Sequence, residues 1–489
     1  MVYKKQRPIP STPQRQRVGK GAGVLVCAAL CLGCVSSLAT AATATLAGDK
    51  PAPPPQSAAR QALLPLSVFT DVLGTDEAKA LAALIRIEQN GHESSVAMLI
   101  DMIYRVPNRR VLVQLIALIE KTTGQKFDGD VNALYEWLWS AERPVHPDYS
   151  EFRAGLHATV DPRFREYFEN HPKAIIRLDE IRWGGVRRDG IPPLKNPKMI
   201  TAREANWLGD DNIVFGVAIN GDVRAYPKRI LAWHEMVKDR IGGMELAGVY
   251  CTLCGALVLY EVTVNGVQHE LGTSGFLYRS NKLMYDHATK SLWSTLTGSP
   301  VVGPLVSKGI ELKSLYVVTT TWKEWRTRHP NTQVLSLDTG YQRDYGEGVA
   351  NRDYFGTDQL MFSVPKRDDR LPNKAEVLAL RLPQVPNETL AIAADFLATR
   401  PVYQTRLGKV NMVVLTDASG ANRVYESKDV MFASWDNTAT VRDTRGKAWQ
   451  MDEARLAGPN GEIFKRLPAH RAFWFGWHAA FPDTRLIKS

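Results

Sequence analysis

The chain has 489 residues, a formal net charge of +10, and 23% charged residues. This length is too great for one compact core and indicates two or three domains. Six of the 61 Lys and Arg lie in the first twenty residues, so the remainder carries 55 basic against 51 acidic side chains, which excludes a broadly basic nucleic-acid-binding surface.

The N-terminal segment, 1–44, has the order of a secretory signal peptide. Its first twenty residues carry basic and no acidic side chains, and the stretch from Gly21 to Val35 is almost wholly apolar or small. Two A-x-A patterns at 39–41 and 42–44 are typical of cleavage sites. We therefore expect a periplasmic or extracellular protein. Two alternatives stay open, an uncleaved membrane anchor and lipidation at Cys34, and either would give the chain its only membrane contact.

Residues 45–58 are rich in proline and predict a stiff linker. The next segment, 59–185, predicts short amphipathic helices, because its apolar residues recur at intervals of three and four. Asp76 and Asn108 are suitable N-caps for two of these helices, and Gly124 is a suitable end. Helices in such a series indicate a HEAT-like repeat module or a plain bundle, with a packing or partner-binding role.

From residue 186 onward the pattern becomes strand-like. The run from Val214 to Ile219 predicts a strand, and Asn220-Gly221 predicts a hairpin turn because both residues tolerate positive φ. The run from Val223 to Tyr226 predicts the returning strand. The predicted fold class is therefore α+β, with a helical N-terminal module followed by a β-rich domain whose first half spans 186–350.

Two pairs of motifs predict an internal duplication of the β-rich domain. The segment Gly221-x-x-Arg224-x-Tyr226 resembles Gly420-x-x-Arg423-x-Tyr425, and Trp322-x-x-Trp325 resembles Trp474-x-x-Trp477, in the same order. Chance similarity of short motifs is the alternative. The second half is expected at 395–489, after a connector at 351–394, and it contains no cysteine.

The exported body retains two of the five cysteines, in Cys251-Thr-Leu-Cys254-Gly255. A C-x-x-C-G turn between two strands resembles a metal knuckle, because both sulfurs can face one ion. An oxidising compartment would instead join the two cysteines in a structural disulfide. A redox-active dithiol is a third alternative, but the strand-like residues that follow Cys254 disfavour it, because reactive cysteines more often begin a helix.

His234, within Trp233-His234-Glu235, is the leading candidate for a third metal ligand. Sulfur and imidazole ligands suit zinc or copper, and a nearby methionine, Met284, would favour copper. Glu235 or Asp286 could orient the imidazole by accepting a hydrogen bond from it. The predicted metal ligands are Cys251, Cys254 and His234.

A polar, glycine-bearing segment at 272–281 predicts a loop that serves as turn structure. The alternative is a loop that lines a ligand cleft with Tyr278, Arg279 and Asn281. The side chains expected to support the metal site or to line the pocket are Glu235, Tyr278, Arg279, Asn281, Met284, Asp286, His287 and Trp293.

Several motifs resemble those of a bacterial and archaeal family known only as domain-of-unknown-function family 3179. They are Asp189-Gly-Ile-Pro192, Ala225-Tyr-Pro227, Trp233-His-Glu235, Tyr250-Cys-Thr-Leu-Cys-Gly255, Gly275-Phe-Leu-Tyr-Arg-Ser-Asn281, Met284-Tyr-Asp286, Ser291-Leu-Trp-Ser294, Thr339-Gly-Tyr341 and Arg343-Asp-Tyr345. The resemblance covers about residues 186–489. It implies that these residues form one unit, and it implies no activity.

The sequence leaves three hypotheses about function. The first is a metal-binding protein that uses zinc or copper. The second is a non-enzymatic module that binds a small molecule or a protein and has a structural Cys251–Cys254 disulfide. The third is a thiol–disulfide oxidoreductase. The sequence does not decide whether the chain is an enzyme.

Overall fold

The computed structural model describes residues 62–489. The predicted signal peptide, 1–44, and the predicted linker, 45–58, lie outside the described residues. None of the helices within 62–489 is both long enough and apolar enough to cross a membrane.

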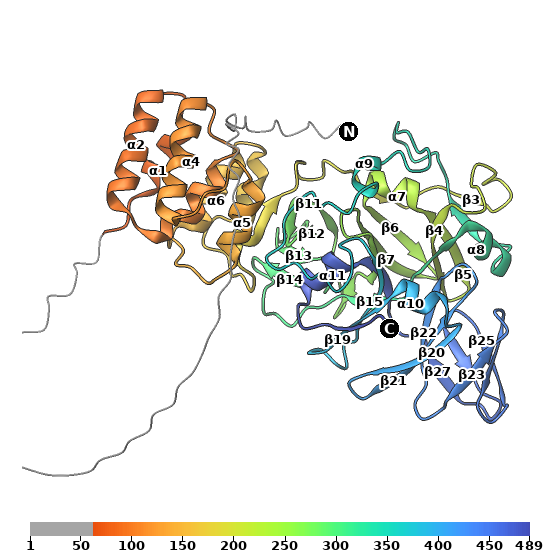
Figure 1. The fold of residues 1–489 in the computed structure, drawn as a ribbon. Coiled ribbons are helices and arrows are strands. Elements are labelled where there is room, and N and C mark those ends of the chain that lie inside the picture. Colours follow the sequence, from red (N-terminus) through yellow and green to blue (C-terminus); the bar gives the residue numbers. More distant parts are fainter. Residues whose placement is uncertain (1–61) are drawn as a thin grey trace, which may run out of the picture.

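A helical region comes first and lies to one side of the β-rich remainder (Figure 1). Its α-helices are α1 (Leu66–Val72), α2 (Glu77–Asn90), α3 (Val96–Met102), α4 (Arg109–Thr123), α5 (Val131–Trp139) and α6 (Tyr149–Ala158). Asp76 caps α2 by accepting a hydrogen bond from the Lys79 backbone N–H at 3.0 Å. Asn108 caps α4 in the same way, and Gly124 ends α4 at φ 68°. The predicted caps and the predicted end are confirmed.

The first part of the β-rich region contains three five-stranded sheets. One has the order β1-β11-β12-β13-β14, the second β15-β8-β7-β6-β2, and the third β16-β4-β5-β17-β3. The strands of the first sheet are β1 (Ile181–Trp183), β11 (Leu271–Tyr278), β12 (Asn281–Asp286), β13 (Leu292–Ser294) and β14 (Pro300–Val302). Those of the second are β2 (Leu194–Lys195), β6 (Met236–Ile241), β7 (Met244–Cys251), β8 (Ala256–Glu261) and β15 (Lys313–Leu315). Those of the third are β3 (Met199–Thr201), β4 (Ile213–Ile219), β5 (Asp222–Pro227), β16 (Val318–Thr321) and β17 (Gln333–Leu335).

Short elements connect these strands. They are α7 (Lys228–His234), α8 (Trp322–Arg328), α9 (Arg352–Phe355) and the small hairpin β9 (Thr263–Val264) and β10 (Val267–Gln268). The predicted hairpin is confirmed: β4 and β5 pair antiparallel, and Asn220 and Gly221 have φ of 49° and 84°. Positive φ at both turn positions suits the twist of the paired strands.

The second part of the β-rich region contains three further sheets. Their orders are β28-β18-β19-β29, β20-β21-β22 and β23-β24-β25-β26-β27. The elements are β18 (Glu376–Arg381), β19 (Thr389–Ala393), α10 (Ala394–Ala398), β20 (Val402–Leu407), β21 (Val410–Thr416), β22 (Asn422–Glu426), β23 (Phe432–Trp435), β24 (Thr440–Asp443), β25 (Ala448–Met451), β26 (Arg455–Ala457), β27 (Ile463–Lys465), β28 (His470–Phe473), α11 (Trp474–Ala480) and β29 (Arg485–Ile487). The stretch 351–394, predicted as a connector, therefore contains β18 and β19.

Two of the sheets share one strand arrangement. In β16-β4-β5-β17 and in β28-β18-β19-β29 the first three strands pair antiparallel and the last pair is parallel. Helix α8 follows β16, and α11 follows β28. Trp325 of α8 donates its indole N–H to Thr332 at 3.0 Å, and Trp477 of α11 donates to Thr484 at 3.0 Å.

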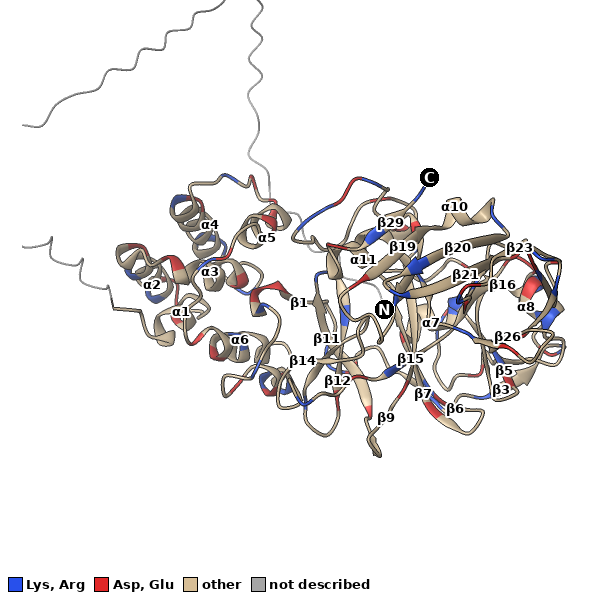
Figure 2. Ribbon diagram, turned by 90° about the horizontal axis from the view of Figure 1, so that it is seen from below, with Lys and Arg blue, Asp and Glu red and all other residues tan. Residues whose placement is uncertain are grey.

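The two G-x-x-R-x-Y segments, in contrast, do not occupy matching places. Residues 222–226 lie in β5, between β4 and β17, whereas 422–425 lie in β22, at the end of a three-stranded sheet. Basic and acidic residues are interspersed along both the helical and the β-rich regions (Figure 2). The largest apolar cluster joins the two β-rich parts, because it contains Met236, Cys251 and Trp293 together with Phe473 and Trp474.

Candidate functional site

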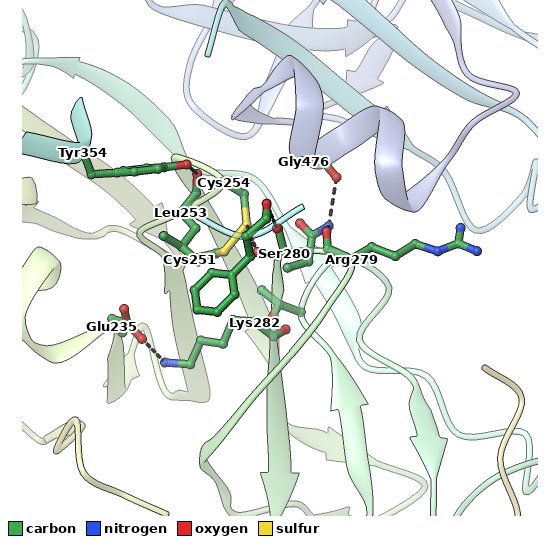
Figure 3. Close-up of a disulfide and its surroundings, with 12 residues drawn as sticks. Glu235, Cys251, Leu253, Cys254, Arg279, Ser280, Lys282, Tyr354 and Gly476 are labelled. Atoms are coloured by element: carbon green, nitrogen blue, oxygen red, sulfur yellow. Dashed lines mark hydrogen bonds and ion pairs between the residues drawn. A yellow bond between two sulfur atoms is a disulfide. The ribbon is translucent and has the colours of Figure 1, made fainter. Parts of the chain in front are cut away.

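Cys251 and Cys254 form a disulfide in the turn between β7 and β8, with 5.4 Å between their Cα atoms (Figure 3). Both side chains are buried in the apolar cluster that joins the two β-rich parts. Gly255 completes the turn at φ 61°, and a side chain there would collide with the ring of Phe473 at 2.9 Å. The pair is thus oxidised and enclosed, which matches the disulfide among the three alternatives that the sequence left open.

His234, the last residue of α7, is fully buried and faces oxygen atoms on both sides of its ring. Its Nδ1 lies 2.9 Å from the Pro192 carbonyl oxygen, and its Nε2 lies 2.6 Å from the Tyr345 hydroxyl oxygen. Burial lowers the pKa of His234, so the ring is neutral at pH 7. A neutral ring that donates from Nδ1 to the carbonyl accepts from the tyrosine at Nε2.

The predicted metal ligands are not assembled within 62–489. The two sulfurs are bonded to each other, and both ring nitrogens of His234 already have oxygen partners. The described residues contain no group of three or more His, Cys, Asp or Glu arranged to hold a metal ion. Zinc or copper binding by Cys251, Cys254 and His234 stays a prediction, and it would require the disulfide to open and the imidazole to give up both partners.

Glu235 forms a partly buried ion pair, and its carboxylate is not among the hydrogen-bond partners of the His234 ring. Its carboxylate lies 2.8 Å from Lys282 Nζ (Figure 3). The same ammonium donates to Thr273 Oγ1 at 3.3 Å. Glu235 itself adopts φ 54° as the C-cap of α7. Lys282 thus joins β12 to the end of α7 close to the disulfide.

Residues 271–278 form the buried strand β11, so the prediction of a loop at 272–281 is wrong apart from the β11–β12 turn. Ser274 explains the polar composition: its hydroxyl donates to the Leu283 carbonyl at 2.6 Å and accepts from the Phe276 N–H at 3.0 Å. These bonds occur where the pairing with β12 shifts register, between Thr273 and Leu277. Because the serine hydroxyl bonds to the backbone at a β-bulge, the polar composition of this strand resembles that of a loop in the sequence.

The predicted pocket residues of the β11–β12 turn serve as structural ties. Arg279 pairs with Glu180 and donates to the Ala479 carbonyl at 3.1 Å. Asn281 donates to the Gly476 carbonyl at 2.9 Å, which fixes the turn to α11. Tyr278, in the last position of β11, has its pKa raised by burial and the nearby Glu180.

Three further predicted residues belong to the interior. Met284 is fully buried in the apolar cluster. Asp286 accepts from His269 Nδ1 at 3.1 Å and also accepts the backbone N–H groups of residues 288 and 289. Trp293 packs against His269, with 5.0 Å between ring centroids. The carboxylate of Asp286 therefore orients an imidazole, but that imidazole belongs to His269.

His287 lies in a surface cleft of about 540 Å³, next to Asp189 and Tyr285. The Tyr285 hydroxyl donates to Asp189 at 2.5 Å and lies 3.5 Å from His287 Nδ1. Gly272 makes this convergence possible, because a Cβ there would lie 2.4 Å from the Tyr285 ring, 2.7 Å from His287 Nε2 and 2.8 Å from Asp189 Oδ1. Burial and the nearby Lys238 lower the pKa of His287, so its imidazole is neutral at pH 7.

Two lysines and one glutamate supply charge to this cleft. Glu270 lies 2.7 Å from Lys195 Nζ and 3.4 Å from Lys238 Nζ. The bond from Lys195, with the charge of Lys238, lowers the pKa of Glu270 to about 2. Burial lowers the pKa of Lys238, whose side chain is mostly covered while that of Lys195 is exposed. The Glu270 carboxylate thus pairs with two ammonium groups, and its contact with Lys238, the more buried lysine, is longer than its contact with Lys195.

The segment Thr339-Gly340-Tyr341 forms the other wall of the cleft. Thr339 Oγ1 lies 2.6 Å from the Tyr345 hydroxyl oxygen, which is the group bound to His234 Nε2. Tyr341 packs against the His234 ring at 5.2 Å and is 42% exposed. A larger hollow of about 750 Å³ shares Tyr341 with this cleft, and Arg229 and Arg343 line it. His234 therefore acts on the cleft by fixing the residues of its rim.

The model of the family DUF3179, described as a protein of unknown function, matches residues 188–484. The chain belongs to the DUF3179 family. No curated protein and no solved structure matches the chain.

The DUF3179 region brings several of the motifs noted in the sequence to this one cleft. Asp189, Tyr285 and Tyr341 come from three separate motifs and line or border it. Sequence reasoning had not proposed these three as ligand-facing residues, nor Lys238 and Lys195. For Asp189, Tyr285 and Tyr341, the sequence feature that could have indicated a ligand site is that acidic, aromatic and glycine residues occur in motifs without an obvious packing role. The two lysines follow no recognisable pattern, because strands that are distant in the chain bring them together.

Proposed function

We propose that the DUF3179 region binds a small organic anion in the cleft of Asp189, Lys238, His287 and Tyr341. The observation that carries this proposal is the meeting of a partly buried ammonium and a neutral imidazole in a cleft of about 540 Å³. Concave sites with a few convergent polar groups and perturbed pKa values are typical of ligand sites.

The charges of the cleft favour an anion. Glu270 is shared by two ammonium groups, and its shorter contact is with Lys195. Asp189 accepts hydrogen bonds from Tyr285 and the Thr273 N–H, so its charge is already engaged. Lys238 is therefore the cation with the least compensated charge, and a ligand carboxylate would pair with it.

The remaining groups define the rest of the ligand. Neutral His287 can donate or accept one hydrogen bond, and it could exchange a proton with the ligand. Tyr341 offers an exposed aromatic face at the rim. A carboxylate joined to a planar or apolar group would use all three elements of the site.

Calorimetric titration of the full chain with benzoate, succinate and their uncharged amides tests this function. We expect saturable binding of at least one carboxylate and none of its amide. In Lys238→Gln the affinity should fall roughly tenfold or more, because a hydrogen bond to a charged group contributes about 1.5–3 kcal/mol. The matched control is Lys313→Gln, an exposed lysine paired with Glu261. Equal affinity in both variants would refute the role of Lys238.

We infer that the Cys251–Cys254 disulfide is structural. The buried position of both sulfurs in the apolar cluster supports this, and so does the strand that follows the turn. A thiol–disulfide enzyme needs an accessible sulfur with a lowered pKa, commonly at the start of a helix. The enclosed turn offers neither feature.

We also propose that the chain is exported, on the strength of the order of charge, apolar run and A-x-A sites in 1–44. The helical region would then support a partner contact outside the cytoplasm, in keeping with its predicted HEAT-like character. A structural disulfide is consistent with that location.

We further infer an internal duplication that keeps the predicted match of the two Trp-x-x-Trp motifs but not that of the two G-x-x-R-x-Y segments. The matching strand orders β16-β4-β5-β17 and β28-β18-β19-β29 support it, as do the two equivalent indole–threonine bonds. In each part a short helix and a three-stranded meander follow the hairpin, β6-β7-β8 in one and β20-β21-β22 in the other. Under this alignment the Cys251–Gly255 turn corresponds to residues 416–420.

A further inference from the structure

A small pocket of about 90 Å³ lies between the two parts of the β-rich region. Lys228 and Thr319–Thr321 line it from the first part, and Glu376, Ser419 and Arg471 line it from the second. It shares no lining residue with the cleft described above. We call it the seam pocket.

Arg471 brings a largely desolvated positive charge to the seam pocket. Its guanidinium donates to the Gly420 carbonyl at 2.6 Å and to Glu376 at 3.3 Å. Its Nε is buried and has no hydrogen-bond partner among the residues that the structure describes. Glu376 is about half exposed, so water weakens its attraction for the guanidinium. The charge of Arg471 is therefore poorly compensated by the protein.

Lys228 adds a second positive charge from the opposite wall. Its ammonium lies 4.8 Å from the centre of the Phe355 ring, and it forms no ion pair with a carboxylate within 62–489. Two cations and one partly exposed carboxylate therefore line the seam pocket; Asp395 and Asp417 also lie near Arg471, but neither lines it. This balance favours an anion as occupant.

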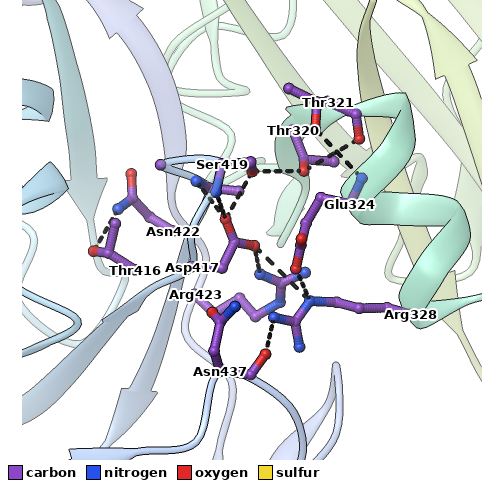
Figure 4. Close-up of polar contacts among 12 residues, drawn as sticks. Thr320, Thr321, Glu324, Arg328, Thr416, Asp417, Ser419, Asn422, Arg423 and Asn437 are labelled. Atoms are coloured by element: carbon purple, nitrogen blue, oxygen red, sulfur yellow. Dashed lines mark hydrogen bonds and ion pairs between the residues drawn. The ribbon is translucent and has the colours of Figure 1, made fainter. Parts of the chain in front are cut away.

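The walls of the seam pocket are held in place without a ligand. Thr320 Oγ1 lies 3.2 Å from Ser419 Oγ, which bridges the two parts directly. Asp417, beneath that serine, accepts from the Ser419 N–H at 3.0 Å and from buried Arg423 at 2.7 Å (Figure 4). Fixed walls reduce the entropy lost when a ligand binds.

We propose that the seam pocket binds one small oxyanion through Arg471 and Lys228, with the hydroxyls of Thr319–Thr321 and Ser419 as further partners. The guanidinium fork suits the oxygens of a carboxylate or a phosphate. A volume of about 90 Å³ admits an ion of a few heavy atoms and excludes a nucleotide or a sugar. The bound ion would tie the two parts of the β-rich region together.

Titration calorimetry of the full chain with inorganic phosphate, sulfate and acetate tests this site and separates the possible anions. We expect saturable binding of at least one of them. Lys228→Gln should weaken that binding roughly tenfold, and Arg471→Gln should weaken it further. Lys409→Gln, at an exposed lysine in the β20–β21 turn and thus at the opposite end of β21 from Ser419, should leave the affinity unchanged.

Absence of saturable binding for all three anions would overturn the proposal. Equal affinity in the wild type and Lys228→Gln would overturn it as well. Lys228→Gln is decisive even if Arg471→Gln fails to fold, because the Lys228 ammonium has no ion-pair partner among the described residues. Loss of phosphate binding in Lys238→Gln would instead assign the ion to the cleft.

Discussion

At the scale of single residues, the cleft depends on the absence of a side chain. Asp189, Tyr285 and His287 come from different strands and loops, and they meet over the Cα of Gly272. Any Cβ there would lie closer than 3 Å to all three groups. Interiors are packed closely enough that such an overlap must displace neighbours.

Gly272→Ala should therefore destabilise the protein by about 1–3 kcal/mol and weaken binding in the cleft. Urea denaturation and calorimetry with the best-bound carboxylate measure the two effects. The matched control is Gly155→Ala in α6, where an added methyl meets no atom within 4 Å. That variant should gain about 0.5–1 kcal/mol, because alanine is favoured over glycine in a helix. Normal binding by Gly272→Ala would show that the convergence is not needed.

His234 makes the stability depend on pH. Burial lowers its pKa in the folded state below the value of about 6.5 in the unfolded chain. Above pH 6.5 both states are neutral and the contribution is constant. As the pH falls below 6.5, the unfolded chain binds a proton that the folded state excludes, so the free energy of unfolding decreases.

When the pH is lowered from 7.5 to 5.5, the free energy of unfolding should decrease in the wild type and in His234→Gln. The decrease should be smaller in His234→Gln, by up to about 1 kcal/mol. Urea denaturation at the two pH values gives this difference directly, even though the variant starts from a lower stability. His171→Gln, at an exposed histidine, should keep the wild-type decline. A decline that is equal in His234→Gln and the wild type would contradict the assignment.

At the scale of elements, the sequence predicted those whose signals are local. The caps Asp76 and Asn108 predicted the starts of α2 and α4, and Asn220-Gly221 predicted the β4–β5 hairpin. Strand β11 was missed because its polar residues satisfy a bulge, which depends on the partner strand β12. Such pairing between strands leaves no periodic trace in either segment.

The β7–β8 turn allows a separate test of the disulfide. Cys251→Ala with Cys254→Ala should lower the free energy of unfolding by roughly 2 kcal/mol, because the bridge closes a loop of only a few residues in the unfolded chain. Carboxylate binding in the cleft should persist, since neither sulfur lines it. Reduced wild type should lose a similar amount of stability. Loss of cleft binding in the double variant would instead indicate that the sulfurs take part in function.

At the scale of the whole molecule, the sequence predicted a helical region followed by a β-rich region, and this order is confirmed. The sequence could not predict which residues that are distant in the chain come together in the folded protein. His234 follows the β4–β5 hairpin, yet its ring contacts Tyr345, which lies 111 positions further along the chain. Proximity in sequence to Cys251 suggested a shared metal, whereas the tertiary fold directs the imidazole to the Thr339–Tyr345 segment and the sulfurs to the core.

The position of a bound ligand tests the central claim most directly. We would determine a crystal structure of the chain with 4-bromobenzoate and locate the bromine by its anomalous scattering. We expect the carboxylate to lie within hydrogen-bonding distance of Lys238 Nζ and the ring to lie against Tyr341. An empty cleft with the ligand bound elsewhere, for example in the larger hollow beside Arg229 and Arg343, would contradict the account.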